Sequence, residues 1–300
     1  MRPRGGIIGA TVQPAATALN SAASGVWTLR EAEALKRAGT WPVVAPGGVV
    51  TGLQLWLDAS DSATLFNATT GGSLVAADGT IKRWEDKSGN GNHATEATNA
   101  PIRKTRVFNG CDTVRFDGTN ALMKTGAISA LNSRTMTVWV VAAQAALTAN
   151  RAVLTIGYGD FSKTSVLELN HHTTAFDGAA SPATCFSFAR NELGVAIATP
   201  SANRFQHSAA TATLLGHTVD SSGTLTSFAN RNTYTGLTAS SGTNAVDTPS
   251  QHQAVGIGVN QFSGITFNGD ICEVIIYNTN LSTNNRNLVI DYLMAKWGIT

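Results

Sequence analysis

The side chains that could do chemistry in this sequence are first of all its carboxylates. Hydrolysis of a glycosidic bond uses two carboxyl groups, held about 5 Å apart when one of them acts as the nucleophile. Glu85 and Asp86 are adjacent, and neighbouring side chains of a strand point to opposite faces. Glu168 and Glu273 each stand alone in the sequence. The sequence therefore offers no local pair of carboxylates for this reaction.

A second group of oxygen-bearing side chains could bind a metal ion. Ca²⁺ takes several carboxylate and carbonyl oxygens, but the spacing of the candidates here matches no EF-hand loop. Asp and Asn side chains also commonly cap their own turns. We therefore expect no cofactor, and calcium is kept only as an alternative. Its candidate ligands are Asp58, Asp61, Asp86, Asn90, Asn92 and Asp117.

The end of the chain predicts a buried strand followed by a helix. Residues 267–277 read FNGDICEVIIY, and alternation puts Ile271, Ile275 and Tyr277 on one face and Cys272, Val274 and Ile276 on the other. A strand that is apolar on both faces is covered on both faces. After it, Ser282 can cap a helix that Gly298 ends. The apolar stripe of this helix is predicted to be Leu288, Tyr292, Leu293 and Trp297.

Short strands separated by turn residues fill the rest of the chain from Leu53 onward. Such regular spacing favours a sandwich over an α/β arrangement. Residues 230–253 are polar and weakly patterned, so we expect a long loop there. Beyond the strand that begins at Leu53, strands are predicted near residues 80–84, 113–116, 135–142, 151–158, 165–169, 183–190, 193–198, 212–220, 225–230 and 255–259.

Four sequence blocks carry a resemblance to a known superfamily. They are LQLWLDASDSATLF, IKRWEDKSGNGNHAT, TVRFDGTNALM and the ending GDICEVIIYN with KWGI. Together they resemble the laminin-G-like branch of the concanavalin A-like lectin/glucanase superfamily. The resemblance implies an all-β fold, a two-sheet antiparallel β-sandwich or jelly roll over residues 51–300, with a C-terminal helix packed on it. The same sandwich hosts lectins, glycanases and purely structural modules.

The resemblance also bears on catalysis. Retaining glucanases of the superfamily carry a Glu-x-Asp-x-Glu motif that places both carboxylates on one strand face. No such triplet occurs in this sequence. Gly-x-Ser-x-Gly, a phosphate-binding glycine-rich loop and His-Glu-x-x-His are absent as well. We therefore expect that the chain is not an enzyme, and a glycan-active enzyme is the least favoured alternative.

Residues 1–50 form a separate N-terminal segment in this interpretation. An Ala, Thr and Gly-rich arm precedes a short predicted helix, in which Thr28 and Glu31 form a capping box and Gly39 ends the last turn. The stretch from RGGIIG to LKRAGTWP resembles N-terminal segments of tailed-bacteriophage virion proteins. This implies a virion subunit of a head or tail appendage, fibre or decoration, assembled in the host cytoplasm. Residues 1–47 would then bind other virion proteins, and the chain would be a homo-oligomer.

Composition excludes several classes of partner. Only 13% of the 300 residues are charged and the net charge is +2, with no basic patch, so no nucleic-acid partner is expected. No run of about 18 apolar residues predicts a membrane span. The three widely spaced cysteines support neither a disulfide framework nor a zinc site. This use of cysteine favours assembly in a reducing cytoplasm. The N-terminus also lacks the apolar core of a signal peptide.

The remaining expectation is a surface for glycans, as in host-surface polysaccharide. Trp56, Trp84, Trp139 and Trp297 are predicted to pack within the fold rather than to stack on sugars. Polar and aromatic residues in loops are better candidates for glycan contact. They are His171, His172, Asp177, Asn230, Asn232 and Tyr234. A free non-catalytic carbohydrate-binding protein and a purely architectural subunit remain alternatives to the virion hypothesis.

Overall fold

The computed structural model describes the backbone and side chains of residues 45–132, 135–146, 152–157, 208–233, 254–259 and 266–300. At residues 6–7, 27–28, 151, 158, 167–172, 184–190, 196–198, 205–206, 234, 238–239, 253, 260 and 265 it describes the pairing of short strands. The described part includes the whole of the C-terminal strand and helix.

One antiparallel sheet forms the middle layer of the molecule, and we call it the helix-covered sheet. Its central strand β23 pairs with β10 along one edge, and with β8 and then β3 along the other. In spatial order the strands are β18 (Asn232–Tyr234), β17 (Leu225–Ala229), β16 (Thr213–Val219), β10 (Met136–Gln144), β23 (Asn268–Tyr277), β8 (Cys111–Asp117) and β7 (Ile102–Phe108), with β3 (Leu53–Asp58) beside β23.

A second antiparallel sheet faces the inner side of the helix-covered sheet. Its order is β19 (Thr238–Ala239), β14 (Ala196–Ala198), β13 (Thr184–Arg190), β12 (Leu167–His172), β11 (Arg151–Tyr158), β20 (Gln253–Ile257), β9 (Met123–Lys124), β6 (Ala94–Thr95), β5 (Arg83–Trp84) and β4 (Leu65–Phe66), with β15 (Phe205–Gln206) on β13. A small ribbon pairs β21 (Val259–Asn260) with β22 (Ile265–Thr266). The predicted two-sheet antiparallel β-sandwich is confirmed.

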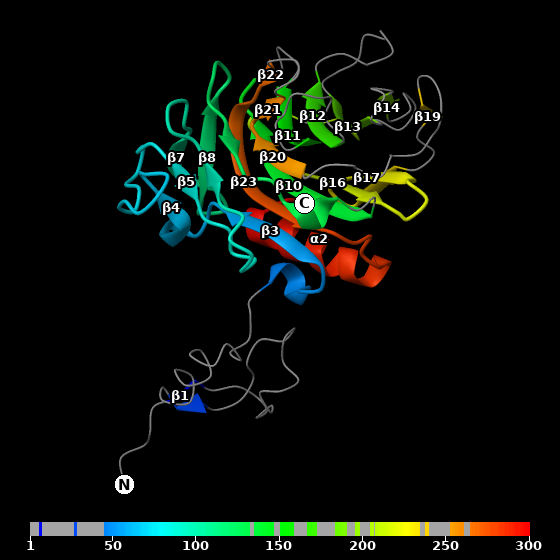
Figure 1. The fold of residues 1–300 in the computed structure, drawn as a ribbon, viewed down its shortest axis with the longest axis horizontal. Coiled ribbons are helices and arrows are strands. Elements are labelled where there is room, and N and C mark those ends of the chain that lie inside the picture. Colours follow the sequence, from blue (N-terminus) through cyan, green and yellow to red (C-terminus); the bar gives the residue numbers. More distant parts are fainter. Residues whose placement is uncertain are drawn as a thin grey trace.

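Two apolar clusters divide the molecule into three layers. Figure 1 shows α2 (Thr283–Trp297) in red below β23 and β10, with the second sheet on the opposite side of these strands. The inner cluster lies between the sheets and includes Leu55, Leu57, Trp84, Val138, Ile156 and Ile276. The outer cluster lies between the helix-covered sheet and α2 and includes Trp56, Trp139, Ile275, Leu293 and Trp297. The predicted burial of these four tryptophans is confirmed, and each is at most 2% exposed.

A β-bulge changes the alternation that was expected in β23. Val141 of β10 is paired with Glu273, but the next residue, Ala142, is paired with Ile271, so Cys272 is the extra residue. Ile271 therefore joins the inner cluster, while Cys272 joins Ile275 and Tyr277 in the outer one. The predicted faces of Ile271 and Cys272 were wrong. Full burial in apolar surroundings also raises the pKa of the Cys272 thiol well above its ordinary value.

The C-terminal helix α2 has the caps that the sequence predicts. The hydroxyl of Ser282 accepts a hydrogen bond from the backbone N–H of Asn285, and Gly298 takes a left-handed conformation. The predicted stripe is wrong at Leu288, which is 44% exposed, and the buried positions are Val289, Ile290, Leu293, Met294 and Trp297. Among the described residues no helix is long and apolar enough to cross a lipid bilayer.

The chain enters the sandwich through the 3-10 turn η2 (Pro46–Gly48), which packs on α2. Gly47 has φ of 60°, and any Cβ there would overlap the backbone of Leu288. Before η2, β1 (Gly6–Ile7) pairs with β2 (Trp27–Thr28), so Thr28, the predicted helix cap, ends a strand. The rest of the predicted N-terminal helix lies outside the described residues, and the division into residues 1–50 and 51–300 stays a prediction.

Several short elements were absent from the sequence interpretation. The predicted loop 230–253 contains β18, β19 and the first residue of β20, and the edge strand β7 was not predicted. His171 and His172 end strand β12 instead of following it. The turns η3 (Ser62–Thr64) and η4 (Ser129–Leu131) were also missed. Such two- to seven-residue elements carry too little periodicity to be recognised from one sequence.

Packing on the outer face predicts a position-specific cost of adding one methyl group. A Cβ at Gly216 in β16 would overlap the indole ring of Trp139, which is fully buried. Gly216→Ala is therefore expected to lower the free energy of unfolding by about 1 to 3 kcal/mol, as overpacking does. Urea denaturation measures this loss. The matched control is Gly126→Ala, because Gly126 has no neighbour within 4 Å of such a Cβ, and equal losses in both variants would contradict the packing argument.

Candidate functional site

Glu273, on the outer face of β23, is a fully buried carboxylate whose partners all come from other elements of the fold. Four side-chain donors from β3 and α2 bind it. Its Oε1 accepts hydrogen bonds from Trp56 Nε1 at 2.7 Å and from the Tyr292 hydroxyl at 2.9 Å. Its Oε2 accepts from Lys296 Nζ and from Trp297 Nε1, both at 2.8 Å. Both oxygens are thus occupied by groups of this chain.

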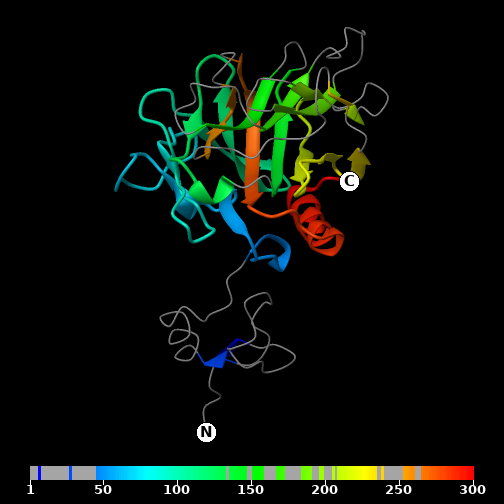
Figure 2. The same cartoon turned by 45° about the vertical axis from the view of Figure 1, so that its right-hand side comes forward.

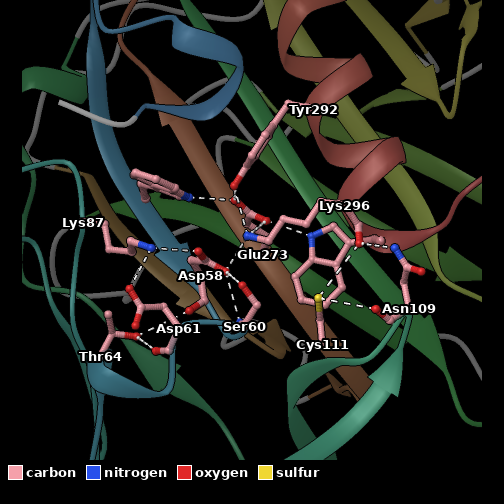
Figure 3. Close-up of polar contacts among 12 residues, drawn as sticks. Asp58, Ser60, Asp61, Thr64, Lys87, Asn109, Cys111, Glu273, Tyr292 and Lys296 are labelled. Carbon is pink, nitrogen blue, oxygen red and sulfur yellow. Dashed lines mark hydrogen bonds and ion pairs between the residues drawn. The ribbon is translucent and has the colours of Figure 1, made fainter. Parts of the chain in front are cut away.

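Asp58 of β3 is the cross-strand partner of Glu273. Its carboxylate contacts Lys296 Nζ at 2.6 Å and Lys87 Nζ at 2.9 Å, and the Ser60 hydroxyl donates to it at 2.6 Å. Figure 3 shows the Lys296 side chain reaching down from α2 between the two carboxylates. The structure therefore contains a carboxylate pair across two strands, although no pair is visible within any one strand of the sequence.

Burial and the shared ammonium group shift the two carboxylates in opposite directions. Burial alone would raise the pKa of Asp58, but the charges of Lys296 and Lys87 outweigh it and hold that pKa below its ordinary value of 3.8. Burial raises the pKa of Glu273 above 4.5, and the nearby charge of Asp58 adds to this rise. Burial and the charges of Glu273 and Asp58 raise the pKa of Tyr292 far above its ordinary value, so its hydroxyl remains a donor.

The lowered pKa of Asp58 predicts how stability depends on acid. A group with a lowered pKa stabilises the fold above its unfolded-state value, and this contribution is lost as the pH falls through the folded-state value. The free energy of unfolding should therefore drop below pH 3.8, and Asp58→Asn should make that drop shallower. Asp117 also has a lowered pKa, but it is present in both the unchanged protein and the Asp58→Asn variant. The difference between their two pH profiles therefore reports Asp58. Identical pH profiles of the two proteins would contradict this assignment.

The network of Asp58, Glu273, Lys87 and Lys296 acts as an anchor for α2. Two carboxylates face two ammonium groups, and every carboxylate oxygen has a partner. Breaking such a buried pair is costly because it leaves an uncompensated charge in a dry environment. The arrangement fixes the last turn of the helix, which includes Trp297, against the sheet.

Beside this last turn lies a pocket of about 510 Å³. It is formed by the end of β7 with its turn, the segment before β16, the residue after β17, and the C-terminal turn. Figure 2 shows the C-terminal end of the chain beside the yellow strands that follow β16. The lining residues are Val107, Phe108, Asn109, Ser208, Ala210, Thr211, Ala212, Thr213, Asn230, Trp297, Gly298, Ile299 and Thr300.

The predicted glycan-contact residues are not gathered in one place within the described structure. Asn230 lines the pocket, while Asn232 is exposed on β18. His171 and His172 lie on β12 of the other sheet and Tyr234 on β18, with side chains outside the described residues. Asp177 also lies outside the described residues. The six residues therefore stay a prediction, and only Asn230 lies in the pocket.

The residues proposed as an alternative calcium site are bound to other groups of this chain. Asp86 accepts from the backbone N–H groups of Trp56, Ser88 and Asn92 at 2.9 Å each. Asn90 and Asn92 donate their side-chain amides to carbonyls of Leu53 and Gln54. Asp61 caps η3, and Asp117 accepts from three backbone N–H groups of its own turn. Among the described residues no group of three or more His, Cys, Asp or Glu side chains is placed to hold a metal ion.

Comparison with known proteins gives a likeness of fold. No family model and no curated protein sequence matches the chain. Among solved structures, a Trypanosoma rangeli sialidase in complex with 2,3-difluorosialic acid has TM-score 0.52 at 14% identity, covering 85% of this chain and 34% of the sialidase. The botulinum neurotoxin serotype D binding domain has TM-score 0.52 at 11% identity, with 84% and 53% coverage. The receptor binding domain of the C/D mosaic neurotoxin has TM-score 0.52 at 11% identity, with 83% and 55%.

These likenesses confirm a sandwich of the kind found in binding domains and correct one expectation. The chain spans about a third of the sialidase and about half of each neurotoxin structure, at identities that establish the fold alone. The expectation that the chain is not an enzyme was wrong, because the same fold occurs within an enzyme, the sialidase. That expectation had also rested on the absence of a local pair of carboxylates in the sequence. In the structure, Asp58 and Glu273 do form a pair across two strands. What these findings establish is a two-sheet β-sandwich that enzymes and binding domains share.

Proposed function

We propose that this chain is a carbohydrate-binding module whose β-sandwich presents the pocket beside the C-terminal turn to a glycan. The observation that carries the proposal is the lining of that pocket, which combines hydroxyl and carboxamide side chains with an aromatic residue, Phe108. Sugars offer hydroxyl groups and apolar C–H faces, so such a lining matches their surface. Asn230 belongs both to the pocket and to the residues that the sequence suggested for glycan contact.

The fold supports this proposal by analogy. One of the similar structures is a receptor binding domain and another is in complex with a sialic acid derivative. A shared sandwich raises the expectation of a binding role, although the site must be argued from its own residues. In this chain that site is the pocket. The anchored helix α2 supplies one of its walls through Trp297 and Gly298.

The setting that we propose for this module is the virion of a tailed bacteriophage. The support is the resemblance of residues 4–42 to N-terminal segments of virion proteins. Residues 1–47 would attach the module to other virion proteins as part of a homo-oligomer, with the sandwich facing host-surface polysaccharide. Many weak sites on one particle would then act together, because linked sites raise the overall affinity without new contacts.

A glycan array with the full-length protein tests the binding function. We expect selective retention of one class of glycan above the background of unrelated glycans. The same incubations, analysed for released sugars, would reveal turnover of a bound glycan. Absence of selective binding across the array would overturn the proposed function.

The virion setting has its own test, which is a mass determination of two proteins. The full-length chain is compared with a chain that lacks residues 1–44 but keeps η2, because Pro46 is buried on the sandwich. We expect the full-length protein to assemble and the shortened one to be a folded monomer. Two monomers of equal stability would contradict an assembly role for the N-terminal segment.

A further inference from the structure

We propose that the pocket binds an uncharged sugar residue of the glycan and that the side-chain amide of Asn230 donates a hydrogen bond to one of its hydroxyl groups. This inference rests on the proposed function and adds the chemical class of the ligand and a residue that recognises it. It places the ligand site at the C-terminal end of α2, between segments that are far apart in the sequence.

The charge of the pocket is the first argument for an uncharged ligand. None of its described lining residues has a charged side chain. A sugar carboxylate is usually recognised by an Arg or Lys, because a buried charge without a partner is unfavourable. A pocket without a cation therefore selects against sialic and uronic acids and leaves neutral sugars as the ligand class.

Two of the cations that lie next to lining residues are already bound to carboxylates. Lys296 precedes the lining residue Trp297, but its ammonium group contacts Asp58 at 2.6 Å and Glu273 at 2.8 Å. Arg231 follows the lining residue Asn230 and pairs with Asp291 at 2.6 Å. An acidic sugar that used Lys296 or Arg231 would have to break the existing ion pair of that residue, whereas a neutral sugar leaves both pairs intact.

Two carboxamides in the pocket keep one polar atom each for a ligand. Asn230 Oδ1 accepts a hydrogen bond from the backbone N–H of Leu214 at 3.0 Å, and its Nδ2 has no partner among the described residues. Asn109 Nδ2 donates to the carbonyls of Lys296 and Ala295 at 2.9 and 3.3 Å, and its Oδ1 has no partner in the described structure. The pocket thus offers a donor and an acceptor, and a sugar hydroxyl can satisfy either.

Both carboxamides are held in place before any ligand arrives. The other half of the Asn230 amide is fixed to β16, and that of Asn109 to the last turn of α2, as Figure 3 shows for Asn109. Side chains that are already ordered lose little conformational entropy when they bind. The partly exposed Phe108 and Ile299 add apolar surface for the C–H face of a sugar ring. These features give the weak, selective binding that suits a multivalent particle.

Ligand-observed NMR with the full-length protein tests the inference. The probes are methyl glycosides of glucose, galactose, mannose and N-acetylglucosamine, and the matched pair lactose and sialyllactose. We expect binding to at least one neutral probe and weaker binding to its acidic counterpart. Asn230→Asp keeps the oxygen that Leu214 uses, tolerates the φ of 51° at this position, and removes the free donor. It should weaken binding by about tenfold or more.

The matched control is Asn232→Asp, an identical change on the exposed strand β18 outside the pocket lining, which should leave binding unchanged. A thermal melt checks that both variants are folded. If Asn230→Asp is unfolded, a second pocket variant takes its place. Ser208→Trp, at an exposed lining position, should fill the pocket and abolish binding. Preference for the acidic probe, or neutral binding that survives both pocket variants, would overturn this inference while the glycan-binding function stands. Binding to no glycan at all would instead overturn the proposed function.

Discussion

Replacing Glu273 with alanine is expected to lower the free energy of unfolding by about 3 to 5 kcal/mol, the cost typical of breaking a buried ion pair. The change removes one carboxylate and leaves four donors without that acceptor, the buried Trp56 and Trp297 and the partly buried Tyr292 and Lys296. Each unsatisfied buried donor adds to the loss. The effect should be large because Glu273 joins the sheet to three residues in the C-terminal half of α2.

Urea denaturation at pH 7 measures this loss, and two further variants calibrate it. Glu273→Gln keeps an acceptor oxygen and nearly the same volume, so its loss should be smaller than that of Glu273→Ala. Asp291→Ala removes one partner of an exposed ion pair with Arg231, in which both side chains are more than half exposed. Such surface pairs contribute about 0 to 1 kcal/mol. A loss below about 1 kcal/mol for Glu273→Ala would contradict its role as the anchor.

Replacing Lys296 with methionine is expected to lower the free energy of unfolding at pH 7 by a similar amount, about 3 to 5 kcal/mol. Methionine keeps the apolar stem of the side chain but removes the ammonium group shared by Asp58 and Glu273. Two carboxylates on neighbouring strands then face each other, with only Lys87 left to balance Asp58. The pKa of Glu273, already raised, should rise further because its cation is gone.

The sign of the pH dependence identifies this mechanism. A carboxyl group whose pKa is raised in the folded state takes up its proton in the folded protein first, so the fold gains stability as the pH falls through that value. The loss caused by Lys296→Met should therefore shrink between pH 7 and pH 4.5. Combining it with Glu273→Gln removes one of the two charges and should restore part of the stability at pH 7. A loss that is independent of pH would contradict the electrostatic account.

Local signals explain which parts of the fold the sequence could predict. Ser282 and Gly298 mark the ends of α2 because capping involves residues within one helical turn. The long apolar strands were predicted near their observed positions, since alternation of side chains is itself a local pattern. The number and spacing of such strands favoured a sandwich over an α/β fold, and the two-sheet form came from the resemblance to the concanavalin A-like superfamily.

The features that could not be predicted all depend on pairing between distant segments. The bulge at Cys272 is defined by the register between β10 and β23, and it moved Ile271 to the inner cluster. The meeting of Asp58 with Glu273 depends on the register between β3 and β23. The sequence did indicate that Glu273 has partners, because an acidic residue inside the apolar run 271–277 must be paired when that run is buried. It did not indicate which residues these partners are.

The pocket has the same origin. Asn109, Asn230 and Gly298 come from a β-hairpin turn, the end of another strand and a helix terminus. The sequence suggested Asn230 because it is polar and follows a strand, but nothing local linked it to Asn109. The anchor at Glu273 also bears on this site, since Trp297 both binds its carboxylate and lines the pocket. Stability of the last turn and binding in the pocket should therefore depend on the same contacts.

The central claim, that this sandwich binds a glycan in the pocket beside its C-terminal turn, is tested most directly by a crystal structure of the full-length protein soaked with the best neutral sugar from the binding experiments. The account predicts density for a sugar ring within hydrogen-bond distance of Asn230 Nδ2, with the pairs of Lys296 and Arg231 intact. Density for the sugar at another surface, with the pocket filled only by solvent, would contradict it.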